Sequence, residues 1–184
     1  MKQKWIENMK TRKRLRLSLK DWLIHYNIAL FILLIPILPI ISLVEYHITE
    51  TYDGVRNPDE MFLVTLIFLI PVIAIYLYQR SKLRLREFNA RFNETQFNLA
   101  LRKTVTEQKW HFKIKDKEFD RLFTDKDGEG EYGGDMIIII RMNNRVLINS
   151  INDISINSNF FQNKRNKQNI MTFIKNLDEI IRKK

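Results

Sequence analysis

The sequence contains no cysteine, and this absence excludes several kinds of site. Without a thiol there is no disulfide, no thiolate metal ligand and no cysteine nucleophile. The three histidines, His25, His47 and His111, are scattered along the chain and share no spacing suited to a metal ion. No residue stands in a recognisable nucleophile or phosphate-binding motif. We therefore predict no metal and no cofactor, and we favour a protein that is not an enzyme.

Charge is missing from two long segments of the chain. Ile28–Val44 has 17 residues and Met61–Tyr78 has 18, and neither contains a charged side chain. A helix of 18 residues is roughly 27 Å long, close to the hydrocarbon core of a bilayer, which is about 30 Å thick. A core helix of a soluble domain has a polar face, and neither segment has one. We predict transmembrane helices over residues 22–46 and 61–78.

Small polar residues are almost absent from both segments: the first has only Ser42 and the second only Thr65. An aqueous pore needs a polar stripe, so the pair of helices is expected to be an anchor, with a pore as the alternative. Pro36, Pro39 and Pro71 free backbone carbonyls within the helices, and we interpret them as tolerated kinks.

The positive charge of the chain is concentrated beside the apolar segments. The net charge is +10; residues 1–26 carry +6 and residues 80–92 carry +4, whereas residues 45–60 carry −4. Lysine and arginine are retained on the cytoplasmic side of a membrane, and short loops decide the orientation. We predict an integral protein of the inner (cytoplasmic) membrane that crosses it twice, with the N-terminus and the C-terminus both cytoplasmic.

The same basic flanks are expected to contact anionic lipid head groups, each residue contributing roughly 1 kcal/mol near the surface. Because this arrangement accounts for most of the excess positive charge, we expect no nucleic acid partner. The predicted head-group contacts are Lys10, Arg12, Lys13, Arg14, Arg16, Arg80, Lys82, Arg84 and Arg86.

Three further segments are defined by composition. Residues 1–21 are a basic cytoplasmic N-terminal segment, which lies along the membrane surface or is only a positively charged leader. Residues 47–60 form a short acidic loop outside the cell. Residues 79–108 contain no glycine or proline and carry apolar residues at heptad-like intervals, so the second span is predicted to continue as a juxtamembrane helix. This helix forms a short coiled coil or, as we favour, packs on the domain that follows.

Residues 109–184 are predicted to form a small cytoplasmic α+β domain. Apolar and polar residues alternate over Trp110–Lys115, which is typical of a half-buried strand, and Phe119–Phe123 adds a second strand or a turn of helix. The β-branched runs Met136–Met142 and Arg145–Ile151 are joined by two asparagines, which tolerate a positive φ, so we predict a β-hairpin.

Two features predict how the sheet of this domain is covered. Four consecutive isoleucines in the first hairpin strand imply burial on both faces. Apolar residues at helical spacing predict a helix over Asn169–Arg182, and this helix can cover one face of the sheet. The predicted fold class is a two-helix transmembrane hairpin followed by a small cytoplasmic α+β domain, with an antiparallel sheet of roughly three to five strands packed by a C-terminal helix.

The segment Ile151–Asn169 is rich in asparagine and combines aromatic with basic residues. Exposed aromatic and basic groups are typical of a binding loop. In the alternative, the two phenylalanines pack under the sheet and the polar residues form a solvated loop. The candidate partner-binding residues are Phe160, Phe161, Lys164, Arg165 and Lys167.

Three classes of function are compatible with these patterns. The first, which we favour, is a membrane-anchored, non-enzymatic module whose cytoplasmic domain binds a protein partner, associates with itself or acts as a sensor. The second is a membrane-perturbing effector or toxin whose hairpin oligomerises. The third is an enzyme that acts on a membrane-proximal substrate.

Overall fold

The computed structural model describes residues 2–49, 57–124, 134–154 and 163–183, and the chain divides into two compact units. Residues 22–81 make up one unit, and residues 1–21 together with 82–184 make up the other. The elements are α1 (Lys2–Arg12), α2 (Leu19–His25), α3 (Asn27–Thr49), α4 (Pro58–Lys82), β1 (Arg86–Asn89), α5 (Glu94–Gln108), β2 (Trp110–Lys115), β3 (Phe119–Thr124), β4 (Asp135–Met142), β5 (Arg145–Asn152) and α6 (Asn163–Arg182).

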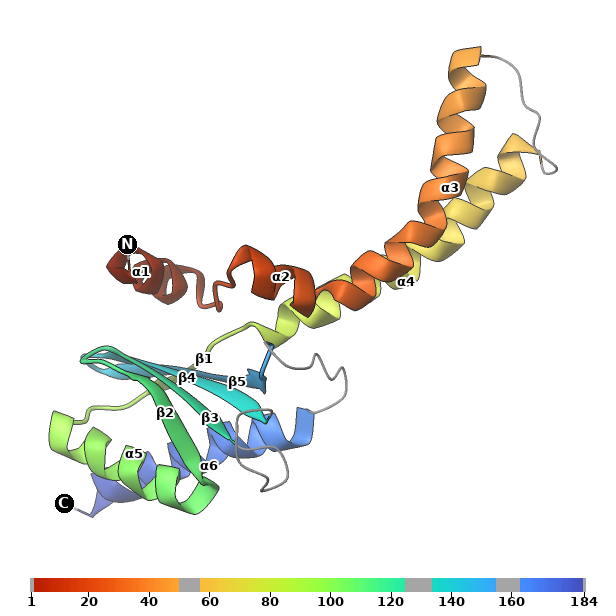
Figure 1. Cartoon of the computed structure of the whole chain (residues 1–184). Helices are drawn as coiled ribbons and strands as arrows, with labels where there is room; N and C mark the ends of the chain where they lie inside the picture. The colour runs from red at the N-terminus through yellow and green to blue at the C-terminus, as the bar shows by residue number, and fades with distance from the viewer. Residues whose placement is uncertain (1, 50–56, 125–133, 155–162, 184) are drawn as a thin grey trace. The chain divides into compact units, whose positions relative to one another are not determined.

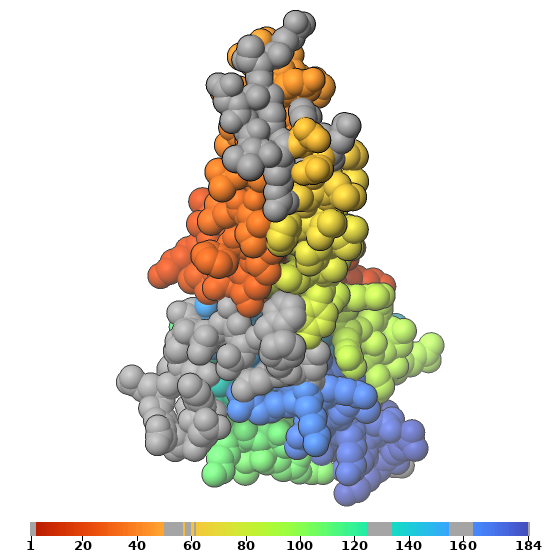
Figure 2. Space-filling view, turned by 90° about the vertical axis from the view of Figure 1, so that its right-hand side faces the viewer, coloured from red at the N-terminus to blue at the C-terminus, as the bar shows by residue number. Residues whose placement is uncertain are grey.

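The first unit is a pair of apolar helices, α3 and α4, which lie against each other in the space-filling view (Figure 2). Both are long and apolar enough to cross a membrane. Phe31, Leu38 and Ile70 are 73%, 70% and 68% exposed, so their side chains suit an apolar surrounding rather than water. The structure thus has helices over both predicted apolar segments.

Aromatic and amide groups join the two helices at one end. The rings of Tyr26 and Tyr76 have their centroids 5.1 Å apart. The Gln79 side chain donates to the carbonyl of His25 (2.7 Å), and the His25 ring lies 2.9 Å from the carbonyl of Gln79. These contacts tie the end of α2 and its connection to α3 to the last turns of α4.

The second unit contains a five-stranded antiparallel sheet in the order β1-β5-β4-β3-β2 (Figure 1). The predicted hairpin is confirmed as β4 and β5, with Met142 opposite Arg145. The positive φ values predicted for the two asparagines of the turn are wrong, however. Among the residues described, only Lys13 and Lys109 are non-glycine residues with a positive φ. The hairpin turn Asn143-Asn144 therefore closes with negative φ values.

One face of the sheet is covered by α5 and α6, which lie on the same side of it (Figure 1). Phe97 of α5 and Phe173 of α6 meet edge to face, with ring centroids 5.7 Å apart, and both pack on Ile137 and Ile139. The C-terminal helix and the α+β shape are confirmed. The helix begins earlier than predicted, at Asn163.

The opposite face of the sheet is packed by the N-terminal helix α1, which Figure 1 shows on the other side from α5 and α6. Trp5 meets Phe119 edge to face at 5.6 Å, and Phe119 is in register with Ile140 of β4. Met9 is fully buried. Residues 1–21 are therefore part of the domain, which corrects the prediction of a separate basic segment: α1 has one apolar face, and that face packs on the sheet.

The predicted juxtamembrane helix over residues 79–108 is also wrong. Helix α4 ends at Lys82, where the Asn149 side chain donates to the carbonyls of Lys82 (2.9 Å) and Arg84 (2.7 Å). The chain then forms strand β1, and α5 starts afresh behind the capping box of Asn93 and Gln96. The last carbonyls of a helix have no partner within it, and the Asn149 amide satisfies the one at Lys82.

Candidate functional site

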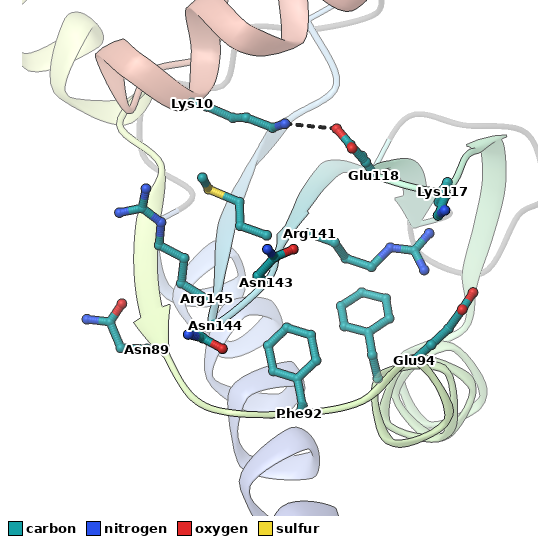
Figure 3. Close-up of a pocket in the computed structure, with 12 residues that line it drawn as sticks. Lys10, Asn89, Phe92, Glu94, Lys117, Glu118, Arg141, Asn143, Asn144 and Arg145 are labelled. Atoms are coloured by element: carbon teal, nitrogen blue, oxygen red, sulfur yellow. Dashed lines mark hydrogen bonds and ion pairs between the residues drawn. The ribbon is translucent and has the colours of Figure 1, made fainter.

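The α+β unit has a pocket of about 720 Å³ at the end of the sheet where its turns gather. Figure 3 shows Lys10 and Glu118 at one rim, with Phe92 and Glu94 at the opposite rim. We call this cavity the strand-end pocket. Its lining residues are Lys10, Asn89, Phe92, Glu94, Phe97, Lys117, Glu118, Arg141, Met142, Asn143, Asn144 and Arg145.

Backbone hydrogen bonds between neighbouring turns hold the pocket open. Ala90 N, in the connection from β1 to α5, donates to the carbonyl of Asn144 in the β4–β5 turn (3.1 Å). Arg141 N donates to the carbonyl of Glu118 in the β2–β3 turn (2.9 Å). Sites formed by loops on a rigid scaffold are the usual places for binding.

Arg141 forms the floor of the pocket. Its guanidinium carbon lies 4.7 Å above the centroid of the Phe97 ring, a cation–π contact, and its Nη2 donates to the carbonyl of Asp116. The same Nη2 is 3.5 Å from Oδ2 of Asp120, whose side chain is completely buried. The charge of Arg141 is thus held in place by an aromatic ring and by a buried carboxylate.

Asp120 is a buried charge with few compensating contacts. The charged and polar groups that favour its ionised form include the Arg141 guanidinium and the backbone N–H of Asp116, and the buried Nε of Arg141 has no acceptor among the residues described. Burial raises the pKa of Asp120, although Arg141 opposes the shift. A perturbed acid beside a cavity is a recognised signature of a functional site.

The rim of the pocket is held by ion pairs to α1. Lys10 Nζ is 2.8 Å from Glu118 Oε2 and 2.7 Å from Glu7 Oε1. The hydrogen bond from Lys10 lowers the pKa of Glu118. Burial acts to lower the pKa of Lys10, but its bonds to Glu118 and Glu7 outweigh this, so the pKa is raised. The N-terminal helix therefore forms one wall of the site.

Cations outnumber carboxylates around the pocket. Lys10, Lys117, Arg141 and Arg145 line it, against Glu94 and Glu118. Three of these cations are paired, Lys10 with Glu118, Arg141 with Asp120 and Arg145 with Glu87, whereas Lys117 forms no ion pair in the described part of the chain. The volume is in the range of small-ligand sites, about 300–1,000 Å³. The lining thus suits an anionic group, either that of a small ligand or an acidic side chain of a protein.

The predicted partner-binding residues have different environments. Phe160 and Phe161 lie outside the described residues. Arg165, in the first turns of α6, pairs with both carboxylate oxygens of the buried Asp135 (2.7 and 3.1 Å), so it stabilises the fold. Lys164 and Lys167 are exposed on the same helix.

The predicted head-group residues have different environments. Lys82 is the last residue of α4, and its carbonyl accepts from the Asn149 side chain. Lys10 and Lys13 form ion pairs with Glu118 and Glu87, and their charges are used inside the domain. In the part of the chain that the structure describes, no ion pair is formed by Arg12, Arg14, Arg16, Arg80, Arg84 or Arg86.

The sequence did not predict the pocket, although one signal was present. Arg141 directly follows four isoleucines, and Asp120 lies between Phe119 and the apolar pair Leu122-Phe123. Charged residues inside buried strands are rare unless they are paired. Comparison with known proteins finds no matching family model, no similar curated protein and no similar solved structure.

Proposed function

We propose that this chain is a two-pass protein of the inner (cytoplasmic) membrane that presents a cytoplasmic α+β domain for binding a partner or sensing a ligand, without catalysing a reaction. One observation carries the proposal. The domain is assembled from residues before the first apolar helix and residues after the second. Two segments that fold together lie on the same side of a membrane, so the hairpin crosses it twice.

The contacts between the two flanks support this topology independently of charge. Leu15 N donates to the carbonyl of Leu83 (2.8 Å), and Leu85 N donates to the carbonyl of Lys13 (2.9 Å). Trp5 of the first flank meets Phe119 of the second edge to face, and Met9 of the first flank is fully buried. The basic flanks then select the cytoplasmic side, because lysine and arginine are retained there.

Labelling of single cysteines tests the topology cleanly, because the chain has no cysteine of its own. In intact cells, we expect a membrane-impermeant maleimide to label Asn57→Cys, in the connection between α3 and α4. We expect Lys4→Cys and Lys183→Cys, near the two ends, to be labelled only after permeabilisation. Labelling of either end in intact cells would contradict the proposal.

The strand-end pocket is the proposed binding site of the domain. Its excess of cations suits an acidic group, and Phe92 supplies an aromatic wall. Arg141 is already positioned by Phe97 and Asp120, so little side-chain entropy is lost when a ligand binds.

Photo-crosslinking in native membranes tests this assignment. A photoreactive amino acid in place of Lys117, at the pocket rim, is expected to give one discrete adduct. The matched control replaces Arg102, exposed on α5 and outside the pocket. The adduct is then purified in mild detergent and identified. Equal adducts at both positions would show that the pocket is not the site.

A further inference from the structure

Two arginines face each other where the flanks of the hairpin meet. Arg14 and Arg84 form an antiparallel β-bridge, and hydrogen bonds of 2.8 and 2.9 Å on either side join residues 13–15 to residues 83–85. This pattern defines a non-hydrogen-bonded pair, whose Cα atoms are about 4.5 Å apart. The two side chains therefore leave the backbone next to each other and on the same face.

Leucines on the other face fix this orientation. Leu15, Leu83 and Leu85 are 6%, 6% and 2% exposed, and they alternate with the arginines. In an extended chain, side chains two residues apart share a face. Arg16 and Arg86 follow the bridge by two residues in each segment, and both are exposed. We call Arg14, Arg16, Arg84 and Arg86 the arginine face.

The charge of the arginine face is not compensated by the rest of the described chain. None of its four guanidinium groups forms an ion pair there. Glu87, the acidic residue next to it, pairs with Lys13 and Arg145 instead. Like charges directly opposite each other destabilise a β-pair. A bound anion would relieve this repulsion.

The chemistry of the face selects the kind of anion. A guanidinium group matches a phosphate with two parallel hydrogen bonds, and two adjacent guanidinium groups match its double negative charge. A phosphate monoester carries close to two charges at neutral pH, since its second pKa is about 6. A phosphodiester carries one charge and leaves part of the repulsion in place.

The covalent chain limits how far this face can lie from the membrane. Arg84 follows the apolar segment that ends at Tyr78 by six residues, of which the first four are helical. Four helical and two extended residues cover at most roughly 13 Å. The polar head-group layer is about 5–8 Å thick on each side of a bilayer. Phosphate groups of lipids are thus the anions present at the highest local density.

We propose that the arginine face binds the phosphate monoester head group of a membrane lipid, with Arg14 and Arg84 as its central contacts. The inference rests on the proposed two-pass topology. It adds a lipid ligand to the domain, at a place separate from the strand-end pocket, which has none of these four arginines in its lining.

Calorimetric titration of the full chain in an uncharged detergent tests this proposal. Short-chain phosphatidic acid, a monoester, is expected to bind more tightly than short-chain phosphatidylglycerol, a diester. The double variant Arg14→Gln/Arg84→Gln is expected to bind phosphatidic acid more weakly, by at least about tenfold. Lowering the pH below about 6 should weaken wild-type binding of the monoester only.

A matched control separates the site from general charge attraction. Arg91→Gln/Arg102→Gln removes two exposed arginines of the same unit, and phosphatidic acid binding is expected to remain unchanged. In the absence of lipid, Arg14→Gln/Arg84→Gln should unfold at the same temperature as the wild type or higher, because a repulsion is removed. A variant that is as stable as the wild type and yet loses the lipid is not explained by misfolding.

Three outcomes would overturn the proposal. One is equal loss of binding in the control variant, and another is equal affinity for the two lipids. The third is displacement of the lipid by inorganic phosphate at equal concentration, which would assign the face to free phosphate. Because the titration is done in detergent, its failure leaves the cysteine-labelling result standing, and the two proposals fail separately.

Discussion

Asp120 and Arg141 are charged residues on the face of the sheet that α5 and α6 cover. Asp120 is in register with Ile139, and Arg141 with Val146, both of which belong to the core under these helices. A buried pair of this kind contributes little net stability, because desolvation offsets the attraction, but removing one partner leaves a costly unpaired charge. Its value lies in fixing the position of Arg141 beneath the pocket.

The raised pKa of Asp120 predicts a pH-dependent difference between the wild type and Asp120→Asn. The folded state holds the proton more tightly than the unfolded chain, whose pKa is near the ordinary value of 3.8. The stability that this group contributes is therefore full below that value and is lost as the pH rises through the folded pKa. As the pH is raised from about 4 to 8, we expect the wild type to lose stability that Asp120→Asn does not lose. The free energy of unfolding of the variant should therefore rise relative to that of the wild type.

Denaturation of the full chain in detergent, followed by tryptophan fluorescence, measures this difference. Asp178→Asn is the control, because Asp178 is partly exposed on α6 and pairs with Arg182 on the same helix. A difference for Asp120→Asn that does not change with pH would show that its carboxyl group titrates alike in the folded and unfolded states.

Helix α1 is the element whose role differs most from the sequence prediction. It closes the second face of the sheet through Trp5 and Met9, and it forms a wall of the pocket through Lys10. The ion pair between Lys10 and Glu118 is exposed on the Glu118 side, so its contribution to stability is small. Apolar burial therefore holds the helix in place.

We expect Met9→Ala to destabilise the domain by about 2–3 kcal/mol, the lower part of the range for truncating a buried methionine. The fully buried side chain leaves a cavity between α1 and the sheet. Thr11→Ala, on the exposed side of the same helix, should change stability by no more than about 0.5 kcal/mol. Thermal unfolding monitored by circular dichroism compares the two, and equal small effects would mean that α1 does not belong to the core.

Elements with strong local patterns were predictable, and those that depend on distant partners were not. The runs of β-branched residues in β4 and β5 and the apolar stripe of α6 each identify an element by themselves. The partner of Trp5 is Phe119, more than a hundred residues later, and no local pattern records that contact. The same reason accounts for the pocket, whose lining comes from α1 and several separate turns.

The sequence contains a short pattern that indicates the break between α4 and α5. Leu83 and Leu85 alternate with Arg84 and Arg86, a period of two, within a stretch that also fits a helix. The capping box at Asn93 marks the start of a new helix. Asn149, which caps the carbonyl of Lys82 at the end of α4, lies far along the chain, so no local pattern records this contact.

At the scale of the whole molecule, the apolar hairpin is an insertion within a domain. Residues 13–15 pair directly with residues 83–85, so the positions where the chain leaves and re-enters the domain are neighbours. Insertions of this kind are tolerated when their ends are close together.

This arrangement predicts that the hairpin can be removed without unfolding the domain. We expect residues 1–17 joined to residues 82–184 by a short Gly/Ser linker to give a soluble, cooperatively folded protein. Residues 82–184 alone lack α1 and the segment that follows it, and they are expected to be less stable by several kcal/mol, since Ile6, Met9 and Leu15 are all buried. Far-UV circular dichroism and thermal unfolding distinguish them. An unfolded or aggregated linked chain would contradict the prediction.

The pairing of the two flanks also has a consequence for synthesis. The N-terminal helix leaves the ribosome long before β3, β4 and α6, and it has no partner until the second apolar helix has been made. In the two-pass topology proposed above, a chain whose second apolar helix fails to cross the bilayer has α1 and the sheet on opposite sides of it, and the domain cannot assemble. On that topology, folding of the domain depends on correct insertion: a chain with both crossings in place completes its core, and one without them stays unfolded and is open to proteolysis.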